Sequence, residues 1–158
     1  MDKSIRKKVL RKITYGIYIL AVESEGQYSA ATITWVSQAS FEPPLLMIGL
    51  KKSSNTYKLV NKTKRFSINI LNESQKNMAA SFFKDTKYDN DKLNGFDIKS
   101  GITNVPVFKD VNSYLECELI NLIEVGDHDI IVAEIKNVEN ISEQDVLNLK
   151  ATGWNYGG

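Results

Sequence analysis

Cysteine and histidine are the scarcest residues of this chain, with one of each among 158 residues. A lone cysteine excludes an internal disulfide, and one cysteine with one histidine cannot build a cysteine-based metal cluster or a zinc site. In the alternating stretch YLECELI, Cys117 is expected to be a packed thiol and not a nucleophile. We therefore expect no metal, neither a zinc enzyme nor a triad hydrolase, and a protein made in a reducing compartment, the cytoplasm.

Long apolar runs and an excess of one charge are also missing. No run approaches the ~18 apolar residues of a membrane span, and the N-terminal region lacks the apolar core of a secretion signal. The 20 Lys and Arg residues balance 19 Asp and Glu to a net charge of +1, so we expect no nucleic-acid or membrane partner. The one basic cluster, in residues 2–13, is interleaved with Ile5, Val9 and Ile13 at helical spacing, which is typical of the solvated face of a helix. Any bound anion must therefore be held by a local site.

What the chain does contain is strand-forming sequence. Its length and its 42% hydrophobic and 25% charged residues are ordinary for one globular domain, and we expect residues 1–158 to form one. Turn sequences at 24–26 and 125–129 join neighbouring strands, so much of the sheet should be antiparallel. The fold is expected to be mainly β, a barrel or a sandwich with a few short helices. Six stretches rich in β-branched and aromatic residues predict the strands: 16–23, 28–40, 44–50, 65–71, 114–125 and 129–140.

The predicted helices are short, and one long segment has no clear pattern. Helices are expected over 2–13, about 54–62 and 74–83. The polar segment 84–108, with its Gly and Asn residues, is interpreted as a long excursion within the domain.

The stretch KKSSNTYKLV, residues 51–60, places many donors at the start of a predicted helix. Either it holds a phosphate or it is only a well-capped surface helix. Unpaired backbone N–H groups and the positive end of the helix dipole suit a phosphate, hydroxyls add neutral donors, and one lysine adds charge. Because neighbouring strand residues point to opposite faces, only one of two lysines should reach it, and the sequence does not say which. The candidate phosphate ligands are Lys51, Lys52, Ser53, Ser54, Asn55 and Thr56.

The predicted strand 28–40, YSAATITWVSQAS, is unusually rich in hydroxyl groups. These side chains either face solvent on an open sheet face or line a site. Pro43 and Pro44 cannot donate to a strand ladder, so the strand must end before them and the chain must turn.

These segments, in this order and spacing and followed by MAASFF and VGDHDIIVAEI, resemble the flavin reductase-like family of FMN-binding split barrels. The resemblance covers residues 12 to 140. It implies a six-stranded antiparallel Greek-key split barrel that forms a homodimer, with FMN bound near the subunit interface. It also implies that the phosphate alternative holds for residues 51–56.

The same resemblance implies further site residues. Fixed donors along residues 32–38 would meet the flavin ring edge and stabilise the charge that reduction places there. Trp35, Phe82 and Phe83 are candidates for flavin contact or for packing. His128, in a turn, is the candidate catalytic residue, with a positioning and polarising role, because hydride transfer needs no general base. The implied cofactor-binding residues outside 51–56 are Thr32, Ile33, Thr34, Trp35, Ser37, Gln38, Phe82 and Phe83.

The resemblance favours an NAD(P)H-dependent flavin reductase that passes a hydride from NADH or NADPH to the flavin. The alternative is a flavoredoxin-like electron carrier that serves a separate redox protein; a pyridoxamine-phosphate oxidase-like or haem-binding barrel and a cofactor-free interaction module rank lower. The Gly-x-Gly-x-x-Gly fingerprint is absent, which excludes a Rossmann site but does not decide among these. The sequence shows no rubredoxin-like or flavodoxin-like module, so any electron partner should be another protein. The aromatic tail with Trp154 and Tyr156 either frays or folds over the flavin of a partner subunit.

Overall fold

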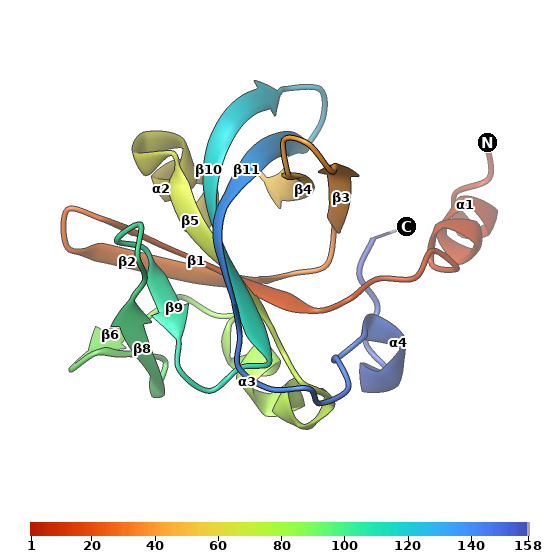
Figure 1. Cartoon of the computed structure of the whole chain (residues 1–158). Coiled ribbons are helices and arrows are strands. Elements are labelled where there is room, and N and C mark those ends of the chain that lie inside the picture. Colours follow the sequence, from red (N-terminus) through yellow and green to blue (C-terminus); the bar gives the residue numbers. More distant parts are fainter. Residues whose placement is uncertain (158) are drawn as a thin grey trace.

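The structure is a computed structural model and describes residues 1–157. Seven strands form one antiparallel sheet in the order β2-β1-β5-β10-β11-β4-β3 (Figure 1). The expectation of a mainly β fold with few helices is therefore confirmed. The strands are β1 (Tyr18–Ser24), β2 (Gln27–Ile33), β3 (Val36–Ser40), β4 (Leu45–Lys51), β5 (Arg65–Ile70), β10 (Ser113–Ile123) and β11 (His128–Asn140).

The expected count of six strands is wrong, because the predicted strand 28–40 is two strands. The ladder breaks at Thr34 and Trp35, and β2 and β3 on either side of this break are the two opposite edges of the sheet. The residues that end β2 and begin β3 are three apart, so they lie within about 11 Å of each other. The sheet must therefore curl until its edges approach at this point, as Figure 1 shows.

The segment 84–108 is not an unstructured excursion. It carries a second, four-stranded sheet of β6 (Tyr88–Asp89), β7 (Lys92–Leu93), β8 (Phe96–Ser100) and β9 (Pro106–Phe108). Its short strands alternate with Asn and Gly turns, which masked them in the sequence pattern. The turn predicted at 24–26 and the end of a strand before Pro43 are present. The turn predicted at 125–129 is shorter, because β11 begins at His128, so this histidine is the first residue of a strand and not a turn residue.

The helices are as short as the sequence predicts. They are α1 (Lys3–Leu10), α2 (Asn55–Thr63), α3 (Lys76–Ser81), preceded by a 3-10 turn at Glu73–Gln75, and α4 (Leu149–Thr152), which the sequence did not predict. Helix α2 packs across one end of the curled sheet through Thr56 and Val60. Within residues 1–157, no helix combines the length and the apolar character needed to cross a bilayer.

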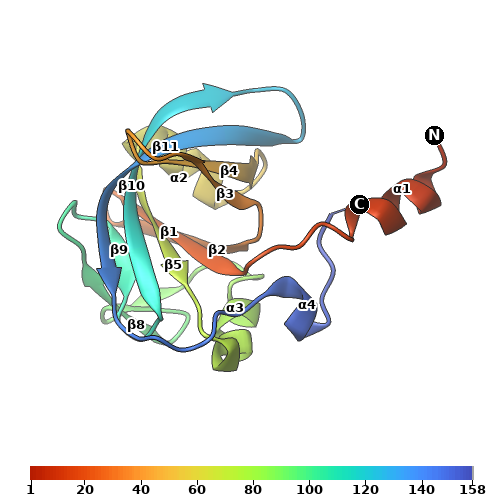
Figure 2. The same cartoon turned by 45° about the vertical axis from the view of Figure 1, so that its right-hand side comes forward.

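Two parts of the chain lie at the same side of the molecule. Figure 2 shows α1 projecting away from the sheet, with the C-terminal segment beside the stretch that follows α1. The Arg11 side chain donates from Nε to the Gly157 carbonyl at 3.4 Å, which joins the two segments. Helix α1 has no buried residue, as expected for a solvated helix, but its apolar side chains are exposed as well.

Candidate functional site

A cavity of about 280 Å³ lies where β2 passes to β3, next to the ends of β4 and β11. Its walls are mostly apolar, with polar groups from the β2–β3 break, Lys51 and His128. The C-terminal tail forms the remaining wall. The lining residues are Ile17, Ala31, Thr32, Ile33, Thr34, Trp35, Gly49, Leu50, Lys51, Ser54, Phe82, Phe83, His128, Leu149, Trp154, Asn155 and Tyr156.

Thr34 and Trp35 give this cavity unused donors. Because both residues lie outside the strand ladder, they do not alternate between two faces, and both line the cavity. Thr34 is only 6% exposed, and neither its Oγ1 nor the Nε1 of Trp35 has a hydrogen-bond partner among the described residues. Buried polar atoms rarely remain unpaired, so these two atoms mark a position where a ligand would complete the hydrogen bonds.

The position of the Trp35 ring depends on Gly49 in β4. The Gly49 N–H donates to the Trp35 carbonyl at 2.9 Å, which holds the break against the sheet. A Cβ on Gly49 would lie 2.9 Å from Cε3 of Trp35, closer than real contacts allow. Glycine is therefore required for the indole to lie flat on β4 and form the cavity wall.

His128 lies opposite Lys51 at the end of the β4–β11 ladder. Its Nδ1 is 2.9 Å from Oδ1 of Asp127, its Nε2 is 2.8 Å from the Tyr156 hydroxyl, and its ring lies 4.7 Å from that of Trp35. The hydrogen bond with His128 lowers the pKa of Asp127. Both ring nitrogens are thus engaged, and the imidazole has a fixed orientation at the cavity edge.

The tail folds over the cavity of its own chain through residue 157, so the expectation of a frayed end is wrong. Tyr156 contacts the Trp35 ring edge-on at 5.4 Å between centroids, and Trp154 contacts Phe83 at 4.9 Å. The 61% exposed Phe83 is thus covered on one side, whereas Phe82 is buried against Phe108 in the core. Phe82 therefore has mainly a packing role.

A second hollow, of about 790 Å³, continues from the cavity toward the start of α2. The two share Ala31, Ser54, Phe82 and Phe83. Ser54 caps α2 by accepting from the Tyr57 N–H at 3.1 Å, and its hydroxyl donates to the Lys51 carbonyl at 2.8 Å. The exposed polar and charged residues of this hollow include Ser53, Asn55, Lys58 and Lys84, together with one carboxylate, Asp85. We call this hollow the α2 groove.

The two lysines of residues 51–52 have different surroundings. Lys51 lines the cavity and forms no ion pair with any residue from 1 to 157. Lys52 instead pairs with the fully buried Asp129 at 2.9 Å, and Asp129 also accepts from the Tyr57 hydroxyl. Burial raises the pKa of Asp129, but the bonds from Tyr57 and Lys52 outweigh this and leave the pKa below its usual value. Lys52 therefore supports the fold beneath the site.

The structure brings most of the sequence-predicted residues together. The cavity collects Thr32, Ile33, Thr34, Trp35, Lys51, Ser54, Phe82, Phe83 and His128, and the α2 groove adds Ser53, Asn55 and Thr56. Within this set, the hydroxyls of Thr32 and Thr56 are already bonded, to the Ala79 carbonyl and to Ser29. Three predicted residues line neither space: Ser37 and Gln38, exposed on β3, and Lys52.

Sequence reasoning missed several lining residues. Gly49 and Leu50 belong to an ordinary strand pattern, and Ile17 and Ala31 are apolar residues without a motif, so no sequence signal identified them. No cluster of potential metal ligands is present in the described part of the chain, 1–157.

Comparison with known proteins places these features in a family. The flavin reductase like domain matches residues 10–153. A protein of Rhizobium meliloti (strain 1021) named "Probable flavin reductase" is 33% identical over 140 residues, which are 89% of this chain and 42% of that protein. The NADH-dependent flavin reductase StyB of Pseudomonas fluorescens is 29% identical over 136 residues, 85% of this chain and 77% of StyB.

A solved structure agrees with these matches. The styrene monooxygenase flavin reductase SMOB of Pseudomonas putida S12 superimposes with a TM-score of 0.80 at 26% identity, covering 95% of this chain and 94% of SMOB. This chain spans less than half the length of the Rhizobium relative but nearly all of SMOB. The matched residues 10–153 include the β2–β3 break, the α2 start and His128. The chain therefore belongs to the flavin reductase like domain family.

Proposed function

We propose that this chain binds FMN and reduces it with NADH or NADPH. The observation that carries the proposal is the cavity in which Thr34 Oγ1 and Trp35 Nε1 are buried without partners, joined to a groove that ends at the start of α2. Its volume of about 280 Å³ is close to the lower end of the ~300–1,000 Å³ of ligand pockets. A mostly apolar cavity lined by unpaired donors suits a flavin ring, and a helix start with a nearby lysine suits a phosphate.

Each group of residues has a role in this proposal. Lys51, Ser53 and Asn55 would hold the FMN phosphate, with the free N–H groups at the start of α2. Thr34 and Trp35 would donate to the polar edge of the ring. His128, held by Asp127 and Tyr156, would orient the nicotinamide side of the site. When bound, the flavin supplies the acceptor for a hydride and needs no protein nucleophile.

StyB is named an NADH-dependent flavin reductase, which supports NADH as the donor. Reduction is tested by mixing the FMN-loaded protein anaerobically with NADH or NADPH and following the flavin band near ~450 nm. We expect the band to bleach within seconds. The His128→Ala variant should keep FMN but bleach about 10-fold more slowly, as a loss of about 1.4 kcal/mol of positioning would produce. Val125→Ala, a solvent-exposed change in the turn that precedes His128, is the control.

The same experiment also tests a second function, that of an electron carrier. The C-terminal tail leaves only part of the cavity open, and a carrier needs only an exposed ring edge. A band that persists for an hour with both nucleotides but bleaches with a reduced iron–sulfur donor would reject the reductase and support the carrier.

We also propose that two copies associate, as the split-barrel resemblance implies, and that α1 contributes to their contact. An eight-residue helix is marginal by itself in water, and Ile5 and Val9 are 60% and 56% exposed on it. Light scattering at micromolar concentration should give twice the chain mass of 17.8 kDa. Replacing Ile5 and Val9 by Ser should shift this mass toward the monomer, and a native protein of one chain mass would contradict the dimer.

The remaining expectations stay proposals. We propose that residues 1–158 act as one domain, that the curled sheet is the family's Greek-key split barrel with one more strand than expected, and that the protein works in the cytoplasm. The proposal of a cytoplasmic protein rests on Cys117, the single cysteine, which is buried. Burial raises the pKa of its thiol to about 12. Such a thiol is suited to packing and not to disulfide chemistry.

A further inference from the structure

A third hollow, of about 710 Å³, lies on the other side of the C-terminal tail from the cavity. The segment after α1 forms one of its walls, and α4 with the tail forms the other. We call it the basic groove. It is lined by Arg11, Lys12, Ile13, Thr14, Tyr15, Asn148, Leu149, Lys150, Gly153, Trp154, Asn155 and Tyr156.

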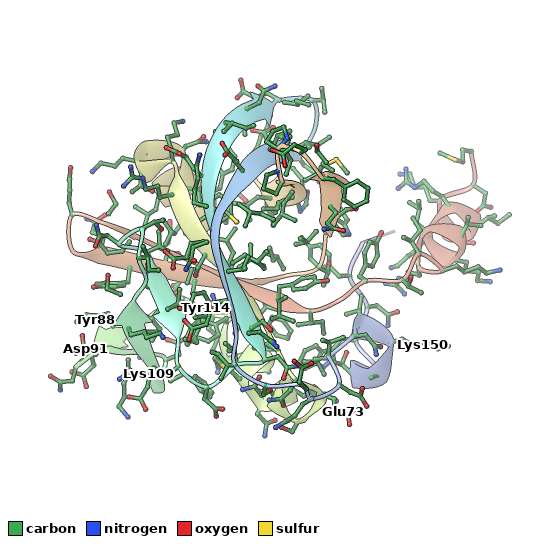
Figure 3. The ribbon with its side chains drawn as sticks, in the orientation of Figure 1. Glu73, Tyr88, Asp91, Lys109, Tyr114 and Lys150 are labelled. Carbon is green, nitrogen blue, oxygen red and sulfur yellow. The ribbon has the colours of Figure 1, made fainter. Side chains whose placement is uncertain are left out.

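The charge of the basic groove has one sign. Arg11, Lys12 and Lys150 line it, and no Asp or Glu does. Throughout residues 1–157, none of these three cations has a carboxylate within 4.0 Å, whereas Lys52, Lys62, Lys92, Lys99 and Lys136 all do. Figure 3 shows Lys150 extending from α4. In a chain of net charge +1, three uncompensated cations in one hollow create a local site for an anion.

The basic groove also offers flat, apolar surface. Tyr15 and Trp154 line it, and Lys76 lies 5.3 Å from the centre of the Trp154 ring. Aromatic faces of this kind stack on a purine or a similar ring. An anion with an attached aromatic base therefore fits better than inorganic phosphate alone.

The groove is continuous with the cavity along a shared wall. Leu149, Trp154, Asn155 and Tyr156 line both spaces. The α2 groove, which we assign to the FMN phosphate, extends from the cavity toward the start of α2 and is lined by none of these four residues. A ligand in the basic groove could thus reach the cavity without competing for the FMN phosphate site.

We propose that the basic groove binds the adenosine diphosphate portion of the nicotinamide dinucleotide that donates the hydride. The assignment rests on the proposed function for the identity of the donor. Such a donor carries a nicotinamide at one end and an adenine at the other, joined through a diphosphate. The nicotinamide must enter the cavity to deliver the hydride. Arg11 and Lys150 pair with the diphosphate, and Tyr15 or Trp154 stacks on the adenine.

The tail links this binding to access to the cavity. The Tyr156 hydroxyl bonds His128, and Arg11 donates to the Gly157 carbonyl, so the tail is held by two groups that the donor needs. A diphosphate on Arg11 replaces the carbonyl with a stronger, charged acceptor. Donor binding therefore releases one of the tail's contacts, that of the Gly157 carbonyl with Arg11, next to the cavity that the nicotinamide must enter.

The test measures binding of ADP to the FMN-free protein by titration calorimetry. Native protein should bind ADP, and the Arg11→Gln, Lys150→Gln double variant should bind it at least about 10-fold more weakly. Lys109→Gln, an exposed lysine on the opposite side of the molecule (Figure 3), is the matched control and should bind like the native protein. Arg11→Lys should recover part of the affinity, because it keeps the charge and loses the planar fork.

A second readout separates this assignment from the reductase proposal. In the bleaching assay the double variant should show a raised KM for NADH with little change in kcat, and its affinity for FMN should be unchanged. No ADP binding to native protein at millimolar concentration, or equal binding by the double variant, would overturn the basic groove assignment whatever the assay shows. ADP binding that the double variant loses, in a protein that neither nucleotide reduces, would keep the groove and reject the reductase.

Discussion

Replacing Glu116 by Ala is expected to lower the free energy of unfolding by about 3 to 5 kcal/mol, a large part of the ~5–15 kcal/mol of a typical domain. Glu116 lies in β10 with no exposed surface and accepts four hydrogen bonds. The donors are the Ile102 N–H at 3.0 Å, the Thr103 N–H and hydroxyl at 2.6 Å each, and the Asn137 side chain at 2.9 Å. Alanine would leave these donors without an acceptor in a dry site.

Urea unfolding followed by circular dichroism measures the loss. Glu118→Ala, two residues along the same strand and paired with Lys136 at the surface, should change the free energy of unfolding by less than about 1 kcal/mol. Because a Cβ on Gly101 would lie 2.6 Å from the Glu116 carboxylate, Gly101→Ala should destabilise the same contact. Equal midpoints for Glu116→Ala and Glu118→Ala would show that the carboxylate does not hold the 101–104 loop.

The same carboxylate predicts how stability depends on pH. Burial raises the pKa of Glu116, but the bonds from Thr103, Asn137 and Ile102 outweigh burial, and the net pKa lies below its ordinary value. A group with a lowered folded-state pKa stabilises the fold fully above its unfolded pKa, about 4.3 for Glu. Its contribution is then lost as the pH falls through the lower folded value. The native protein should thus lose stability below about pH 4.3, and Glu116→Gln should lack this part of the loss.

Opposite results are expected for the two neighbouring lysines of residues 51–52. Lys51→Met with Ser53→Ala should raise the Kd for FMN by ~10- to 100-fold and leave the urea midpoint unchanged, because Lys51 makes no ion pair within the described chain and faces the cavity. Lys52→Met should lower the urea midpoint, because it leaves the buried Asp129 with Tyr57 alone. Its folded fraction should bind FMN within about 3-fold of the native protein.

Intrinsic fluorescence gives a direct measure of FMN binding. The chain has two tryptophans, and both Trp35 and Trp154 line the cavity. A flavin bound there should quench most of the tryptophan emission, and the titration gives the Kd for each variant. Two results together would contradict these assignments. One is a Lys52→Met variant that loses FMN affinity with an unchanged urea midpoint, and the other is a Lys51 variant that has a lowered urea midpoint with unchanged FMN affinity.

Much of the sheet followed from the sequence, because period-two alternation and turn residues report local structure. β1, β4, β5, β10 and β11 begin and end within two residues of their predictions. The break at Thr34 and Trp35 could not be predicted in this way. YSAATITWVSQAS continues as one strand by composition, and the break exists only because the two halves pair with β1 and β4 on opposite edges.

The site also combines residues that local sequence patterns predicted with residues whose positions depend on distant parts of the chain. The hydroxyls and lysines near residue 51 and the lone His128 have local signals, and the structure places them around one cavity. The choice between Lys51 and Lys52 depends on Asp129, which is far away in sequence. The position of Trp35 depends on Gly49, on a strand that is its neighbour only in the folded sheet. The folding of the tail over the cavity depends on its contacts with His128 and Phe83, for which an aromatic, glycine-rich segment gives only a composition.

The pairing of β4 with β11 has a consequence for the order of folding. The hairpins β1–β2 and β10–β11 join neighbours in sequence, so they close small loops and can form early. β4 pairs with β11 across about half of the chain, and closing so large a loop costs more entropy. Lys51, Gly49 and His128 meet only through this pairing, so the cavity is assembled in a late step. A ligand that binds there stabilises contacts that form after the early hairpins, so it should slow unfolding more than it accelerates folding.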